Sequence, residues 1–276
     1  MATSHNDELL SAWRSKEQQG ALSKLAVTEP DLVIPWIDEN EKLSRACLKF
    51  GLNAIHDWNP VNYNLSKWSG GARVSDKCDL CGSAQESLAH VLCGCPVACL
   101  SGDPNHPRNR YTWRHNAVLR QVSNRLREQV GDRYDIITDL RTGTGTYRDI
   151  PQAITDIVGS LRPDVVMYND EEVVFGELTC PMEANMRKRH EEKTTRYRDV
   201  AMPAGVSRRI VKFAFEVGAR GGVTSTLKSF LGYFGIEKRE YRKFRDRLSR
   251  TALQCSHLIF RNKAIREWAD PQYGWY

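Results

Sequence analysis

The chain has 276 residues, which suits one large domain with appendages or two modest domains. It carries 40 Lys and Arg against 34 Asp and Glu, so its net charge of +6 is a mild basic excess that favours a polyanionic partner. The sequence has no apolar run of about 18 residues and no signal-peptide pattern at its N-terminus, which excludes a predicted transmembrane helix and a membrane partner. We therefore predict a nuclear or otherwise intracellular protein that is not secreted and whose thiols are reduced.

Residues 1–76 are predicted to form a segment of helices and irregular chain. The first 20 residues are polar and are expected to be frayed. Up to about Leu52 a patchy helical pattern is interrupted by prolines. The apolar positions that follow the acidic run at 38–41 nevertheless predict an amphipathic helix. Residues 53–76 contain Trp, Pro and Gly without periodicity and indicate an irregular connector.

The next segment is distinguished by its cysteines, because five of the eight in the chain lie between positions 78 and 99. In a reducing compartment this density indicates a metal site and not disulfides. Two cysteines three apart can both point inward from a tight knuckle, and a second pair from the following short helix completes the tetrahedron of a closed structural Zn²⁺ site. Cys93 lies three residues after the histidine and is an alternative fourth ligand that the spacing leaves open. The favoured ligands, in the pattern Cys-x2-Cys-x8-His-x4-Cys, are Cys78, Cys81, His90 and Cys95.

A linker and the start of a larger domain follow the cysteines. Residues 100–109 contain prolines and no periodicity, which is typical of a linker. Tyr111 to Val130 has apolar residues four apart and predicts a helix, and residues 134–138 predict a strand. Alternating threonine and glycine at 142–146 predicts a flexible loop.

The most informative motif is a Pro-Asp pair, Pro163-Asp164, followed after 12 residues by Glu177. Apolar residues follow the first acid and precede the second, and the polar run Asn169–Glu172 between them predicts a hairpin. Pairing the two strands would bring the carboxylates side by side, where they repel unless a cation lies between them. Mg²⁺ suits such a site because it takes oxygen ligands and keeps several waters, one of which it can activate. An ordinary structural turn is the alternative interpretation.

Four further elements complete the predicted fold. Glu183 to Val200 predicts a charged helix, and residues 209–217 alternate as a strand does. Thr224 to Phe234 predicts a helix, and Glu237 to Trp268 predicts one or two helices whose first half is basic. This order predicts an α/β fold in which a mixed central sheet is flanked by helices. The predicted divisions are an N-terminal segment at 1–76, a zinc knuckle at 77–99, a core at 110–235 and a basic helical C-terminal extension at 236–276.

Taken in order, these motifs resemble a known family. A Cys-Cys-His-Cys knuckle precedes Trp113-Arg114-His115-Asn116, then Arg162-Pro163-Asp164, then Glu177-Leu178-Thr179, then Lys193 and Tyr197. This series resembles the C-terminal part of site-specific non-LTR retrotransposon proteins that carry a restriction-like endonuclease. By motif the resemblance covers about residues 65–200. It implies a nuclease core of the PD-(D/E)xK type.

The resemblance implies roles for four residues of the core. Asp164 and Glu177 match the acids that bind Mg²⁺ or Mn²⁺, with the Leu178 carbonyl beside them. The usual lysine two residues after the second acid is replaced by Thr179, and a hydroxyl cannot supply its positive charge. The best match comes from the next helix, where Lys193 would assist the attacking water and Tyr197 shares its face. Lys188 is the alternative lysine.

The resemblance also implies contacts with DNA. Arg114 and His115 match a motif at the start of the first core helix, where they would contact DNA phosphates or shape the site. Arg189 and Arg196 lie in basic stretches of the charged helix beside the acids, and basic side chains of this density can hold phosphates without sequence preference. The alternative for each is a solvated helix charge.

These observations favour a metal-dependent DNA endonuclease with a structural zinc knuckle. A junction-cleaving nuclease that acts on branched DNA is the nearest alternative, and a non-catalytic, domesticated nucleic-acid-binding protein is the next. A zinc-stabilised protein-interaction module would show no salt-dependent affinity for DNA. No reverse transcriptase motif is visible, so RNA or a separate reverse transcriptase portion is a further expected partner. The lack of a visible reverse transcriptase motif is consistent both with an excised endonuclease portion and with a standalone gene.

Overall fold

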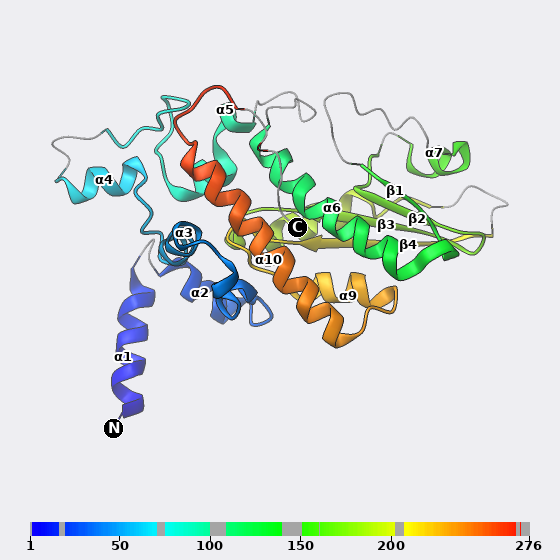
Figure 1. Cartoon of the computed structure of the whole chain (residues 1–276), viewed down its shortest axis with the longest axis horizontal. Helices are drawn as coiled ribbons and strands as arrows, with labels where there is room; N and C mark the ends of the chain where they lie inside the picture. The colour runs from blue at the N-terminus through cyan, green and yellow to red at the C-terminus, as the bar shows by residue number, and fades with distance from the viewer. Residues whose placement is uncertain are drawn as a thin grey trace.

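A computed structural model describes residues 2–16, 20–70, 75–99, 109–139, 151–159, 161–201, 207–268 and 271. In this part of the chain, four β-strands form a mixed sheet with helices against both of its faces (Figure 1). The predicted α/β class with a mixed, helix-flanked central sheet is therefore confirmed. The predicted linker up to residue 108 and the glycine-containing loop at 142–146 lie outside the described residues.

The sheet has the strand order β1-β2-β3-β4. Its strands are β1 (Asp135–Thr138), β2 (Val165–Tyr168), β3 (Glu172–Thr179) and β4 (Arg209–Glu216). The first three strands are antiparallel neighbours, whereas β3 and β4 run parallel. The predicted hairpin between β2 and β3 is present because the Asn169 side chain accepts hydrogen bonds from the backbone N–H groups of Glu171 and Glu172, both at 2.9 Å. The parallel pair requires a crossover, which α8 (Met186–Arg196) supplies.

Helices α6 (Arg110–Val130), α9 (Ser225–Tyr233) and α10 (Lys238–Arg261) cover one face of the sheet, and α6 and α10 cross in front of it in Figure 1. The side chains of α6 that lie four apart, predicted to be its apolar stripe, are all buried against the strands. The C-terminal segment forms one long helix, α10, so the two-helix alternative is wrong.

The opposite face is covered by α7 (Gln152–Val158) and α8. Ile154 and Ile157 of α7 pack against Val166, Val173 and Phe175 of the central strands. The sequence did not predict α7, whose seven residues are too few to show a clear helical period. Because α8 lies along β3 and β4, its inner side chains reach the residues of those strands.

The N-terminal segment is more regular than predicted. It contains α1 (Ala2–Ser15), α2 (Ala21–Thr28), the short 3-10 turns Pro35–Ile37 and Asn40–Lys42, α3 (Arg45–Ile55) and α4 (Asn62–Trp68). The prediction of frayed chain is wrong for residues 2–15, which form the helix α1 that extends away from the rest of the molecule (Figure 1). The predicted amphipathic helix is α3, whereas the predicted connector contains α4.

A buried ion pair joins the N-terminal segment to the end of the sheet. The Glu183 carboxylate binds the Arg220 guanidinium at 2.7 Å and also accepts the backbone N–H groups of Arg220 and Gly222. The carbonyl of Arg220 in turn accepts the indole N–H of Trp36, which is fully buried. Gly218 approaches the carboxylate so closely that a Cβ at this position would collide with it.

Replacing Glu183 by Ala is expected to lower the free energy of unfolding by about 3–5 kcal/mol, because it leaves the buried Arg220 charge without its partner. Chemical denaturation measures this loss. Glu191→Ala, at an exposed position of α8, is the control and should change stability by less than about 0.5 kcal/mol. A loss below about 1 kcal/mol for Glu183→Ala would contradict the assignment of this pair as a structural tie.

Candidate functional site

Asp164 and Glu177 lie side by side at one end of the sheet. Val165 of β2 pairs with Gly176 of β3, so the next position of the antiparallel register places Asp164 opposite Glu177. Both acids are buried, with 1% and 2% of their surface exposed, and their carboxyl groups are close enough for one shared proton to join them. The structure thus brings together the two acids that the hairpin prediction paired.

The electrostatics of the two acids differ. Burial raises the pKa of Glu177 to about 8, and the adjacent Asp164 carboxylate adds to this shift. Burial would also raise the pKa of Asp164, but His115, together with the contacts to Glu177 and Lys193, holds it below its usual range. Two carboxyl groups in this arrangement share a proton, which a cation bound between them would displace. Their oxygen donors are of the type that Mg²⁺ and Mn²⁺ prefer.

Lys193 reaches the acid pair from α8. Its Nζ lies 3.2 Å from Glu177 Oε2, and its side chain is 17% exposed. Tyr197, one turn further along, is buried and hydrogen-bonded to the same carboxylate. The alternative lysine, Lys188, is exposed elsewhere on the helix, while Thr179 ends β3. The helix therefore places a cation against Glu177, whereas Thr179 carries no charge.

His115 lies against the same site. Its Nε2 is 3.3 Å from Asp164 Oδ2 and 3.2 Å from the Leu178 carbonyl. The Leu178 N–H donates to the same Asp164 oxygen at 2.8 Å, so this carboxylate is held from two sides. Of the two roles predicted for His115, its position fits the shaping of the site.

The prediction that Arg114 contacts DNA is not compatible with its position. The side chain is 1% exposed and donates to Ser256 Oγ at 3.0 Å and to the Cys180 carbonyl at 2.8 Å. A guanidinium held in the interior cannot reach a DNA phosphate. Consecutive helix residues point about 100° apart, so a motif that is continuous in sequence is divided between the core and the acid site.

Arg189 and Arg196 occupy exposed positions of α8. Arg189 forms an ion pair with Glu192 at 2.6 Å, one turn away on the same helix. A pair this exposed contributes little to stability, so it leaves the arginine available to a phosphate at small cost. Both DNA contacts stay predictions.

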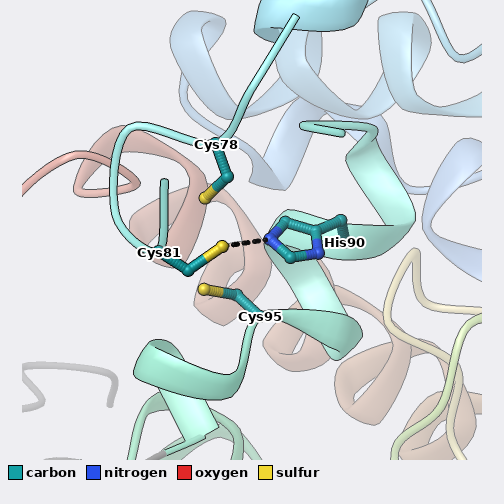
Figure 2. A group of neighbouring side chains, drawn as sticks. All are labelled: Cys78, Cys81, His90 and Cys95. Carbon is teal, nitrogen blue, oxygen red and sulfur yellow. Dashed lines mark hydrogen bonds between the residues drawn. The ribbon is translucent and has the colours of Figure 1, made fainter. Parts of the chain in front are cut away.

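Four of the knuckle side chains converge on one point, as Figure 2 shows. The ligand atoms of Cys78, Cys81, His90 and Cys95 all lie within 4.8 Å of one another, and Cys81 Sγ is 3.5 Å from His90 Nε2. Tetrahedral zinc with Zn–S bonds of about 2.3 Å separates its ligands by about 3.8 Å, so small movements would close this cluster on an ion. The cluster could therefore hold zinc or a similar ion.

The local backbone favours a thiolate at this cluster. The loop reverses at Gly82, whose φ of +71° suits glycine, and brings the backbone at Ser83 and Ala84 toward Cys81. Although burial opposes it, hydrogen bonds from this backbone lower the pKa of Cys81 to about 6, whereas burial raises the pKa of Cys78 to about 12. A thiol ionised near neutral pH binds zinc without a large cost of deprotonation.

The structure separates the two candidate fourth ligands. Cys95 is 1% exposed and belongs to the cluster. Cys93 faces the other way, where its sulfur lies 3.4 Å from a guanidinium nitrogen of Arg114 and 3.9 Å from the Cys180 carbonyl. The turn of π-helix from His90 to Gly94 produces this separation, which spacing alone left open.

The knuckle is attached to the rest of the molecule through residues that the sequence did not single out. The Tyr111 hydroxyl accepts the Cys95 N–H at 3.0 Å and donates to the carbonyl groups of the turn before it. The Glu86 carboxylate is fully buried, accepts the Asn62 N–H at 2.9 Å and binds the Lys263 ammonium. These contacts join the knuckle to α6, α4 and the chain after α10.

Comparison with protein families and with curated proteins assigns this chain to no family. No protein-family model matches the chain, and no curated protein matches its sequence significantly. Across the described ranges, none of the helices has both the length and the apolar character needed to cross a membrane. The site itself therefore carries the functional argument.

Proposed function

We propose that this chain is a metal-dependent DNA endonuclease with a core of the PD-(D/E)xK type, related to the endonuclease portion of site-specific non-LTR retrotransposon proteins. The observation that carries the proposal is the contact of two buried carboxylates, Asp164 and Glu177, with a lysine from the following helix. A purely structural role explains this arrangement poorly, because burying two adjacent carboxyl groups, one of which must keep its proton at neutral pH, opposes folding. Strongly perturbed acids beside a cavity are typical of catalytic sites.

In the proposed reaction, Asp164 and Glu177 would hold Mg²⁺ or Mn²⁺. The bound ion would supply an activated water and neutralise charge on the phosphate. Lys193, 3.2 Å from Glu177, orients the attacking water and stabilises negative charge that develops on the phosphate oxygens. His115 and the Leu178 N–H fix the Asp164 carboxylate, so little reorganisation is needed when the phosphate arrives. Attack of the water oxygen on phosphorus would break the P–O3′ bond, and the products would be a nicked strand with a 3′ hydroxyl and a 5′ phosphate.

The remaining predicted features support substrate binding. The knuckle, loaded with zinc, keeps residues 77–99 folded against α6, and the exposed arginines of α8, Arg189 and Arg196, hold phosphates near the acids. Binding by such contacts weakens steeply as salt rises. This gives the proposal a second measurable property that is independent of cleavage.

The proposal is tested by nicking of supercoiled plasmid in Mg²⁺ and in EDTA, with Lys193→Ala beside Lys188→Ala. We expect nicking only with the metal, a loss of about 100-fold in Lys193→Ala and less than a threefold change in Lys188→Ala, since Lys188 lies outside the acid site. Equal losses in both variants would contradict the role of Lys193. Salt-dependent DNA binding without cleavage in Mg²⁺ or Mn²⁺ would instead establish the non-catalytic binding protein.

A further inference from the structure

A cavity of about 210 Å³ opens directly beside Glu177, between α8 and the strands β3 and β4. Phe175 and Tyr197 form an aromatic wall, and Ala214 lies on the neighbouring strand. Lys193 lines the cavity where it meets the acid pair. The proposed reaction uses Glu177 and Lys193 but leaves the rest of this space without a role.

The walls of the cavity are fixed by packing. Phe175 is 1% exposed and Tyr197 is 4% exposed, and their ring centroids are 6.3 Å apart. Ala214 pairs with Glu177 in the parallel register of β3 and β4, so its methyl group is the reason that space remains beside the acid. A leucine at this position would fill much of that space.

Three cationic side chains, those of Lys193, Arg198 and Lys212, line the cavity together with the Glu177 carboxylate and Thr194. Lys193 lies on the side of the acids, and Lys212 contributes a second ammonium from β4. The Lys212 Nζ donates to the Arg198 carbonyl at 2.8 Å, which anchors it close to α8. An apolar, aromatic interior with cations around it suits a ligand that is planar and apolar at one end and anionic at the other.

We propose that this cavity receives the base of an unpaired nucleotide next to the phosphate that is cut. The inference rests on the proposed nuclease function and specifies its substrate as DNA with an unpaired or extruded nucleotide. An apolar cavity of about 150 Å³ accommodates benzene, so the space here is sufficient for one base. A base in an intact duplex is stacked and paired and cannot enter, whereas an unpaired base can be extruded into a pocket of its own size.

The test measures binding of the full chain to fluorescent DNA in EDTA, where no cleavage occurs. Three duplexes are compared. The first is fully paired, the second carries a one-nucleotide bulge, and the third carries a bulge of one abasic nucleotide. We expect the base-containing bulge to bind about 10-fold more tightly than the abasic bulge, because only the base fills the cavity. Equal affinity for the two bulges would overturn the proposal, since it would show that backbone distortion alone is recognised.

Substitutions at Ala214 test whether this cavity is the site that binds the unpaired base. Ala214→Leu should remove the preference for the base, and Ala214→Val, which a strand accommodates more readily, should reduce it in part. Ala46→Leu, at an exposed position of α3, should retain the full preference. A preference that persists in a folded Ala214→Leu protein, or in a folded Ala214→Val protein at full strength, would place the base elsewhere.

Failure of the base-binding proposal and failure of the proposed nuclease function give different results. If the wild-type protein nicks DNA in Mg²⁺ but ignores the unpaired base, the nuclease assignment holds and the cavity assignment fails. If the base preference is present and no DNA is cut, the cavity binds a base in a protein that is not a nuclease.

Discussion

Replacement of Asp164 by Asn is expected to lower plasmid nicking in Mg²⁺ by about 100- to 1,000-fold, which corresponds to the several kcal/mol that a correctly held metal supplies. The side chain keeps its size, and its amide oxygen can still accept the Leu178 N–H, so the fold should persist. What it loses is the negative charge opposite Glu177. Affinity for DNA in EDTA should be nearly unchanged, because Asp164 is buried.

Asp170→Asn is the matched control for this prediction. Asp170 is a fully exposed acid in the turn that joins β2 to β3, on the same hairpin as the acid pair. Its replacement removes the same charge by the same chemistry and should leave nicking unchanged. Full activity of Asp164→Asn would show that the cleavage comes from another site or from a contaminating nuclease.

Loss of the knuckle metal is the second large effect that we expect. Structural zinc contributes about 10–16 kcal/mol of apparent binding free energy in small zinc-dependent folds, which exceeds the stability of many domains. Tyr111 and Glu86 join the knuckle to α6, α4 and the chain after α10, so its unfolding should spread into the apolar cluster that contains Phe50, Leu92 and Trp113. Cys95→Ser is therefore expected to lose most of its zinc and to lower the Tm by about 10 °C or more.

Cys93→Ser tests the same prediction with a neighbouring cysteine. Its sulfur faces Arg114, so this variant should retain one zinc ion per chain and most of its thermal stability. Elemental analysis of the purified variants, together with thermal unfolding with and without a chelator, measures both properties. Retention of zinc by Cys95→Ser combined with its loss from Cys93→Ser would reverse the assignment of the fourth ligand.

Local patterns were sufficient to predict much of the sheet and part of the site. The strand at 209–217 alternates, the helix from Tyr111 has apolar residues four apart, and Asn169 begins a turn between two apolar runs. These signals depend on neighbours within about 20 residues, which is the range over which period and turn chemistry act. The contact of Asp164 with Glu177 could be predicted for the same reason, since one hairpin carries both acids.

Other features depend on contacts between distant parts of the chain. Arg114 is buried because Ser256 and Cys180 accept its hydrogen bonds, although both are far away in the sequence. The pairing of Glu183 with Arg220 and the attachment of Glu86 to Lys263 likewise join separate elements. No local period indicates such partners.

The sequence by itself determined the α/β class, the four strands, the acid hairpin and the cysteine-histidine pattern of the knuckle. Each of these depends on the spacing of residues that are close together along the chain. Only the tertiary structure decided that Lys193 reaches Glu177, that His115 holds Asp164, that Cys95 joins the cluster, and that Ala214 leaves a cavity beside the acids. Each of these depends on the direction in which a side chain points once helices and strands are packed. Packing sets that direction through contacts between segments that are remote in sequence.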